Sequence, residues 1–150
     1  MTLSANESLD TYREAFEGLA APPLRGLAGT WRAEFVGPLA LRKTAGPGLA
    51  LLGLPGFWGK ELGHDGQGIN LLTREGGKDR TLPMQLRVEP SRIDGRPSVV
   101  IHYAEDAPLP WRFVIDELRA VDGRTLLAMS LVDRGPLKRA PLPFLLHRER

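Results

Sequence analysis

Three histidines, His64, His102 and His147, are the side chains of this sequence best suited to acid–base or metal chemistry. No two of them have the helical or strand spacing that would place a pair of metal ligands on one face. His64 precedes Asp65 in a glycine-rich segment. Such a pair could act as a general base, but a solvated turn is the simpler interpretation. The sequence therefore predicts no metal site.

Other signatures of catalysis are sparse. The sequence contains no Gly-x-Ser-x-Gly elbow, no phosphate-binding glycine loop and no dinucleotide fingerprint. Cysteine is absent, which excludes disulfides, thiolate–zinc sites and cysteine nucleophiles. Asp116 and Glu117 are neighbours in an expected strand, so they lie on opposite faces and cannot act as a pair on one substrate. His102 alternates with apolar residues and faces either solvent or an interior space. The sequence thus leaves the catalytic residues unknown.

The composition is that of one globular domain. The chain has 150 residues, of which 42% are hydrophobic and 25% charged. A net charge of +2, without a run of basic and aromatic residues, argues against a nucleic-acid partner. We find no secretory signal and no apolar run near the roughly 20 residues of a membrane span. We therefore expect a cytoplasmic monomer or homodimer without a membrane span.

Glycine followed by an aromatic residue opens two expected strands, at residues 29–35 and 56–62. The 17 glycines and 13 prolines separate further alternating segments, which favours many short strands joined by turns. Pro83 cannot donate a ladder hydrogen bond, so its strand should lie at an edge or contain a bulge. Asp122-Gly123 predicts a tight hairpin. The other expected strands cover residues 39–44, 69–74, 81–89, 98–103, 111–116, 125–132 and 144–149.

An amphipathic helix is expected before the strands. Ser4 and Glu7 have capping-box spacing, apolar residues then recur at helical intervals, and Pro22-Pro23 ends the element. This helix should close an end or cover a side of the domain. The segment 46–48, Gly-Pro-Gly, should break the chain before a helical turn or lid at residues 49–54.

These elements predict a mainly β fold, a single antiparallel barrel of roughly eight strands with an N-terminal helix. Residues 1–23 would form the helix and linker, and residues 29–150 the barrel, within one domain spanning 1–150. Closure removes exposed sheet edges, and about eight strands leave room for one small ligand. A two-sheet sandwich with a solid core is the alternative.

Four segments resemble small bacterial proteins named for a Gly-x-Trp-x-Gly motif, which is followed by a C-terminal domain of unknown function. The resemblance lies in residues 29–35, 56–61, 121–127 and 143–149, and Ala33 replaces the last glycine of the motif. More distantly, the Gly-x-Trp strand resembles the opening strand of lipocalins and other calycin barrels, in which the tryptophan plugs one end. The resemblance implies a calycin-like barrel with an internal pocket and supplies no established reaction.

His147 on the last expected strand resembles the haem ligand near the C-terminus of nitrobindin-like barrels. A neutral imidazole in an apolar cup can bind haem iron. Haem is therefore the alternative to our expectation that the protein has no cofactor.

Our leading hypothesis is a β-barrel that binds a small hydrophobic or amphipathic ligand, such as a lipid, an isoprenoid or a polyketide-like compound. A cyclase or isomerase acting on such a molecule is an alternative, and it would need an inward-facing His, Asp, Glu or Tyr with a shifted pKa. Haem binding through His147 is another. The residues expected to line the ligand site are Trp31, Phe35, Trp58, Met84, Tyr103, Trp111, Phe113 and Met129.

Overall fold

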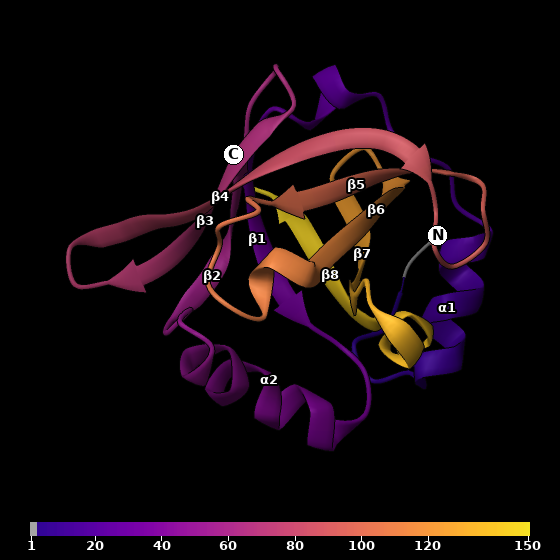
Figure 1. Ribbon diagram of the computed structural model, residues 1–150, viewed down its shortest axis with the longest axis horizontal. Coiled ribbons are helices and arrows are strands. Elements are labelled where there is room, and N and C mark those ends of the chain that lie inside the picture. The colour runs from indigo at the N-terminus through magenta and orange to yellow at the C-terminus, as the bar shows by residue number, and fades with distance from the viewer. Residues whose placement is uncertain (1–2) are drawn as a thin grey trace.

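The chain forms a closed barrel of eight antiparallel strands, each paired with its neighbours in the sequence (Figure 1). The computed structural model describes residues 3–150. The first strand closes the barrel against the last, with Trp31 opposite Arg148 and Phe35 opposite Phe144. This confirms the predicted eight-stranded, mainly β barrel and excludes the two-sheet sandwich. The strands are β1 (Gly29–Phe35), β2 (Phe57–Leu62), β3 (Gln67–Arg74), β4 (Gly77–Pro90), β5 (Pro97–Tyr103), β6 (Val114–Asp122), β7 (Thr125–Val132) and β8 (Leu142–Arg148).

Helix α1 (Leu9–Glu17) packs against the outside of the barrel wall. Its own Tyr12 and Phe16 are fully buried against the wall. The helix is capped by Ser8, whose hydroxyl accepts the Thr11 N–H, and not by Ser4 as the capping-box spacing predicts. The Ser4 carbonyl instead accepts a hydrogen bond from the Tyr12 hydroxyl, which holds the segment before the helix in a turn. The wall residues under α1 include Leu127, Met129 and Leu145.

Helix α2 (Leu39–Leu51) is the largest departure from the sequence prediction, which placed a strand at residues 39–44 and a break at 46–48. The segment begins at the cap residue Pro38 and is rich in leucine, alanine, lysine and arginine, which favour helices. Pro47 lies inside the helix, where it removes one backbone hydrogen bond and brings its ring against the preceding turn. In Figure 1, α2 lies across one end of the barrel. Packing on that end outweighs the local breaking signal.

Two bulges set which side chains of the wall point inward. The β3–β4 register shifts at Leu82, which has a φ of 54°, so the bulge predicted at Pro83 is confirmed. The β2–β3 register shifts at Trp58, and Phe57 and Lys60 consequently both face the interior although they are three residues apart. A side chain at Gly59 would overlap the Trp31 carbonyl oxygen, so the close approach of β1 and β2 there requires glycine.

The strand predicted at 111–116 begins later than expected. Trp111–Phe113 form a short 3-10 helix, η2, and β6 starts at Val114. The two aromatic residues therefore do not alternate along a strand with Ile115. The predicted hairpin at Asp122-Gly123 joins β6 to β7 and is confirmed.

A buried ion pair fastens α1 and the turn after β4 to the barrel wall. Arg119 is fully buried on the outer face of β6. Its guanidinium donates to both carboxylate oxygens of Asp94, at 2.6 and 2.8 Å, and to the Phe16 carbonyl at 2.9 Å. The hydrogen bonds from Arg119 lower the pKa of Asp94 to about 2. Three segments distant in sequence are thereby held together.

We expect Asp94→Asn to reduce the free energy of unfolding by at least about 2 kcal/mol at pH 7, because the Arg119 charge would stay buried without its carboxylate. The folded-state pKa of Asp94 is depressed from 3.8 to about 2. The stabilisation is therefore complete above about pH 4 and disappears as the pH falls through about 2. Urea unfolding of the unchanged protein and of Asp94→Asn between pH 7 and pH 2 is the measurement. The difference between their free energies of unfolding should shrink as the pH falls.

Asp79→Asn is the matched control. The Arg74–Asp79 pair spans 2.9 Å, but its side chains are 62% and 52% exposed, so its loss should change stability by less than about 1 kcal/mol. Equal losses in the two variants would contradict the role assigned to Asp94.

Candidate functional site

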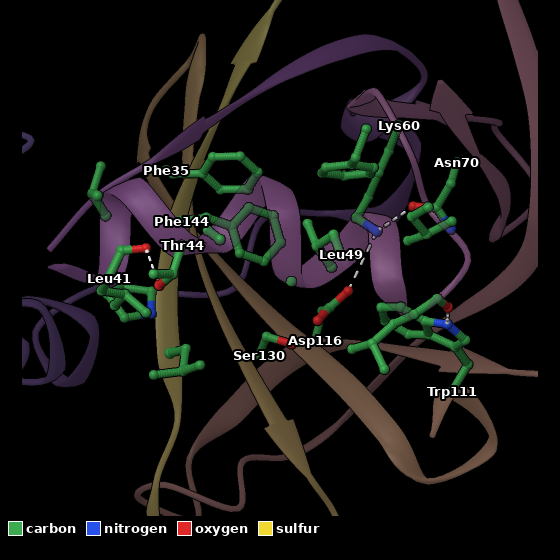
Figure 2. Close-up of a pocket in the computed structure, with 18 of the residues that line it drawn as sticks. Phe35, Leu41, Thr44, Leu49, Lys60, Asn70, Trp111, Asp116, Ser130 and Phe144 are labelled. Carbon is green, nitrogen blue, oxygen red and sulfur yellow. Dashed lines mark hydrogen bonds and ion pairs between the residues drawn. The ribbon is translucent and has the colours of Figure 1, made fainter. Parts of the chain in front are cut away.

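A cavity of about 310 Å³ lies at the end of the barrel that α2 covers (Figure 2). Its wall is largely apolar. Helix α2 contributes Leu41, Ala45, Gly48 and Leu49, which share one helical face. The opposite face of this helix is open to solvent, with Leu51 89% exposed. The apolar residues that the barrel and the adjoining loops contribute include Phe35, Phe57, Trp111, Pro143 and Phe144.

A buried polar cluster, made of Lys60, Asn70, Tyr103 and Asp116, forms part of the cavity wall. The Lys60 Nζ lies 2.8 Å from the Asn70 Oδ1, 3.0 Å from the Tyr103 hydroxyl and 3.4 Å from the Asp116 Oδ2. The Tyr103 hydroxyl donates to the same Asp116 oxygen at 2.9 Å. Four hydrogen-bonding side chains from β2, β3, β5 and β6 thus meet at one point.

The barrel register creates this meeting point. Lys60 and Asn70 are direct partners across β2 and β3, and Lys60 shares the inner face of β2 with the buried Leu62. Asp116 shares the inner face of β6 with the buried residues Val114 and Leu118. None of these positions is close to another in the sequence, so the cluster exists only when the barrel is closed.

Burial dominates the electrostatics of the cluster. Burial lowers the pKa of Lys60, and the neighbouring Asp116 carboxylate partly opposes that shift. Burial and the same carboxylate raise the pKa of Tyr103 well above its usual value. Tyr103 therefore keeps its proton at neutral pH and serves as a hydrogen-bond donor. The centre of the Phe57 ring lies 5.6 Å from the Lys60 Nζ, which adds a favourable contact with the ammonium.

Three of the eight residues predicted to line a ligand site, Phe35, Tyr103 and Trp111, do line this cavity. Trp31 is buried near the other end of β1, where its indole donates to the Leu27 carbonyl at 2.8 Å. Met84 lies in the apolar interior of the barrel and is not among the residues around the cavity. The structure thus brings the aromatic residues of β1, β5 and η2 together and leaves these two elsewhere.

The remaining three predicted residues lie outside the cavity. Trp58 occupies the bulge, and its ring lies 4.2 Å from the Lys78 ammonium. The Phe113 ring is covered by the Arg134 guanidinium at 4.2 Å. Met129 points to the outer face of the wall, under α1. Strand alternation alone cannot distinguish a residue inside the barrel from one buried beneath a covering helix, which explains the placement of Met129.

Sequence reasoning missed Lys60, Asn70 and Ser130, and it considered Asp116 only as a neighbour of Glu117. A signal was present for Asp116, because a charged residue between Val114 and Leu118 on an apolar strand face is unusual. A signal was also present for Lys60, because it lies two residues before Leu62, which is buried in the barrel interior.

The histidines lie apart from the cavity. His147 is on the outer face of β8 and pairs with Glu34 at 2.8 Å, and His102 pairs with Glu89 at 2.8 Å. No histidine is among the described residues that line the cavity. His147 therefore does not fit as the ligand of a haem in this pocket. Among residues 3–150, no group of three His, Asp or Glu side chains is arranged to hold a metal ion.

The comparisons with known proteins inform the fold. No protein-family model matches the chain, and no curated protein sequence matches it. The chain is similar to a protein from Thermomonospora curvata whose crystal structure is known, with 23% sequence identity and a TM-score of 0.72. The similarity covers 97% of this chain and 91% of that chain. At this identity the likeness shows the barrel fold alone. Within the described residues, no helix has the length and apolar character needed to cross a membrane.

We expect the Lys60–Asp116 pair to behave as one unit in stability measurements. Asp116→Leu alone should cost about 3 kcal/mol, because it leaves the Lys60 ammonium buried beside no opposite charge. Lys60→Met alone should cost a similar amount. The double variant should be more stable than either single variant, because an apolar pair replaces both charges at once. Urea unfolding of the three variants measures the coupling, and additive losses would show that the two charges do not depend on each other.

Proposed function

We propose that this protein binds a small, mostly apolar molecule with one polar group inside the barrel. The observation that carries this proposal is the cavity of about 310 Å³, whose apolar wall surrounds a single buried polar cluster. Sites for small molecules commonly combine an apolar lining with a few polar groups that fix orientation. At about 30 Å³ for each water-sized unit, the volume suits on the order of ten non-hydrogen atoms.

The polar cluster favours a binding role over a purely structural one. Lys60 and Asp116 are 2% and 3% exposed. Removing such charges from water costs several kcal/mol per ion, and apolar residues of similar size often stabilise a fold equally well. A charge pair placed at the wall of a cavity is therefore more useful for recognising a ligand than for holding the barrel together.

Helix α2 lines and covers the cavity at one end of the barrel. The Trp111 indole donates to the Leu52 carbonyl at 2.8 Å and so fastens the end of α2 to η2. At the other end of the barrel, Trp31 is 1% exposed, with the Arg148 guanidinium 4.3 Å from its ring. One end closed by a tryptophan and the other covered by a helix also support the proposed calycin-like relationship.

A cyclase or isomerase is a second candidate, and the cluster itself favours it. Lys60 has a lowered pKa, and its amine lies beside a carboxylate at the cavity wall. Such a group can exchange a proton with a bound molecule. A molecule that copurifies with the protein, identified by native mass spectrometry, separates the two functions. Its recovery unchanged by isomer-resolving chromatography after prolonged incubation supports binding alone, and conversion to an isomer supports the enzyme.

As a probe we take 1-nonanol, which has a nine-carbon apolar chain and one hydroxyl. We expect Ala45→Trp to weaken its binding at least about tenfold, because Ala45 is on the α2 face that lines the cavity and an indole would fill the space. Ala50→Trp is the matched control, because Ala50 is exposed on the same helix. Its affinity should stay within about twofold of the original. Isothermal titration calorimetry measures both. Equal affinities for the two variants would contradict the location of the site.

A further inference from the structure

The polar cluster leaves the Lys60 ammonium with no donor to spare. A lysine ammonium has three N–H groups. The Lys60 Nζ has three acceptors within reach: the Asn70 Oδ1 at 2.8 Å, the Tyr103 hydroxyl oxygen at 3.0 Å and the Asp116 Oδ2 at 3.4 Å. A ligand carboxylate would have to displace one of these partners to reach the ammonium.

The cluster does leave one carboxylate oxygen available. Both interactions at Asp116 fall on Oδ2, which accepts from Tyr103 and faces Lys60. Among residues 3–150, no donor forms a hydrogen bond to its Oδ1. Asp116 is only 3% exposed, and it lines the cavity. Oδ1 is not sealed inside the wall but keeps some exposure, so a ligand in the cavity can supply it with a donor.

A hydroxyl lies next to this free oxygen. Ser130 is the direct partner of Asp116 across β6 and β7, and it lines the same cavity. Figure 2 shows the Ser130 side chain beside Asp116 on the floor of the pocket. Its Oγ also forms no hydrogen bond within the described part of the chain. The cavity therefore presents one open acceptor and one hydroxyl, which can both donate and accept, at adjacent positions.

We propose that the polar end of the ligand is a neutral hydroxyl group, an alcohol or a phenol, that donates to the Asp116 Oδ1 and accepts from the Ser130 Oγ. This inference rests on the proposed binding function. The charges of Lys60 and Asp116 already compensate each other. A carboxylate would add a second anion beside Asp116, and an ammonium would add a second cation beside Lys60. Each would be unfavourable in this poorly solvated space.

The test is a titration of the full chain with three nine-carbon probes at pH 7.5: 1-nonanol, nonanoate and nonylammonium. We expect 1-nonanol to bind at least about tenfold more tightly than either charged probe. Equal or tighter binding of a charged probe would overturn the hydroxyl assignment and leave the binding function standing. Failure of all three probes to bind would overturn the binding function as well.

Two variants locate the hydroxyl. Ser130→Ala should weaken 1-nonanol roughly three- to tenfold, the effect of one hydrogen bond, and leave nonanoate unchanged. Thr44→Val is the control, because the Thr44 hydroxyl lines the cavity but already donates to the Ala40 carbonyl at 2.8 Å.

Asp116→Asn should reverse the preference for 1-nonanol over nonanoate, because it leaves the Lys60 charge unopposed. Equal losses for Ser130→Ala and Thr44→Val would overturn the assignment without relying on Asp116→Asn.

Discussion

The contact between Lys60 and Asp116, 3.4 Å apart inside the barrel, is the constraint that ties the alignment of the strands around the cavity. Both charges are removed from water, so each needs the other and the hydrogen bonds of Asn70 and Tyr103. These four residues come from four strands of the sheet. A slip of one residue in any of these strands would turn its polar side chain to the outer face. The register of half the barrel is therefore tied to one small group of polar atoms.

The two ends of the barrel have different roles because different residues fill them. Around Trp31 the interior is packed, and Arg148 covers the indole ring. At the other end the aromatic residues line a cavity, and α2 covers that cavity without filling it. The ion pair of Arg119 and Asp94 lies outside the wall and joins α1 to the sheet. The packed end and the outer supports thus lie away from the cavity.

The sequence predicted the architecture far better than the site. Strand alternation, the hairpin after β6 and the bulge at Pro83 are local signals, and each agrees with the closed barrel. Helix α2 was missed because its glycine–proline segment signals a break that tertiary packing overrides. Met129 has the pattern of an inward residue, but it lies beneath α1. Trp58, which was predicted to face inward, occupies a bulge. Which face of a barrel strand is the inside depends on distant segments, so a single strand cannot reveal it.

The extra residue at Trp58 has a consequence for how this chain can change in length. Its indole lies away from the cavity, against Lys78, and contributes nothing to the lining. Its presence nevertheless sets the count of residues between Phe57 and Lys60. Many residue types could occupy this position without disturbing the interior. Deleting it would leave Phe57 and Lys60 two residues apart, a spacing that regular strand alternation also directs to one face. This strand can therefore lose one residue at the bulge without reversing the side chains that line the cavity.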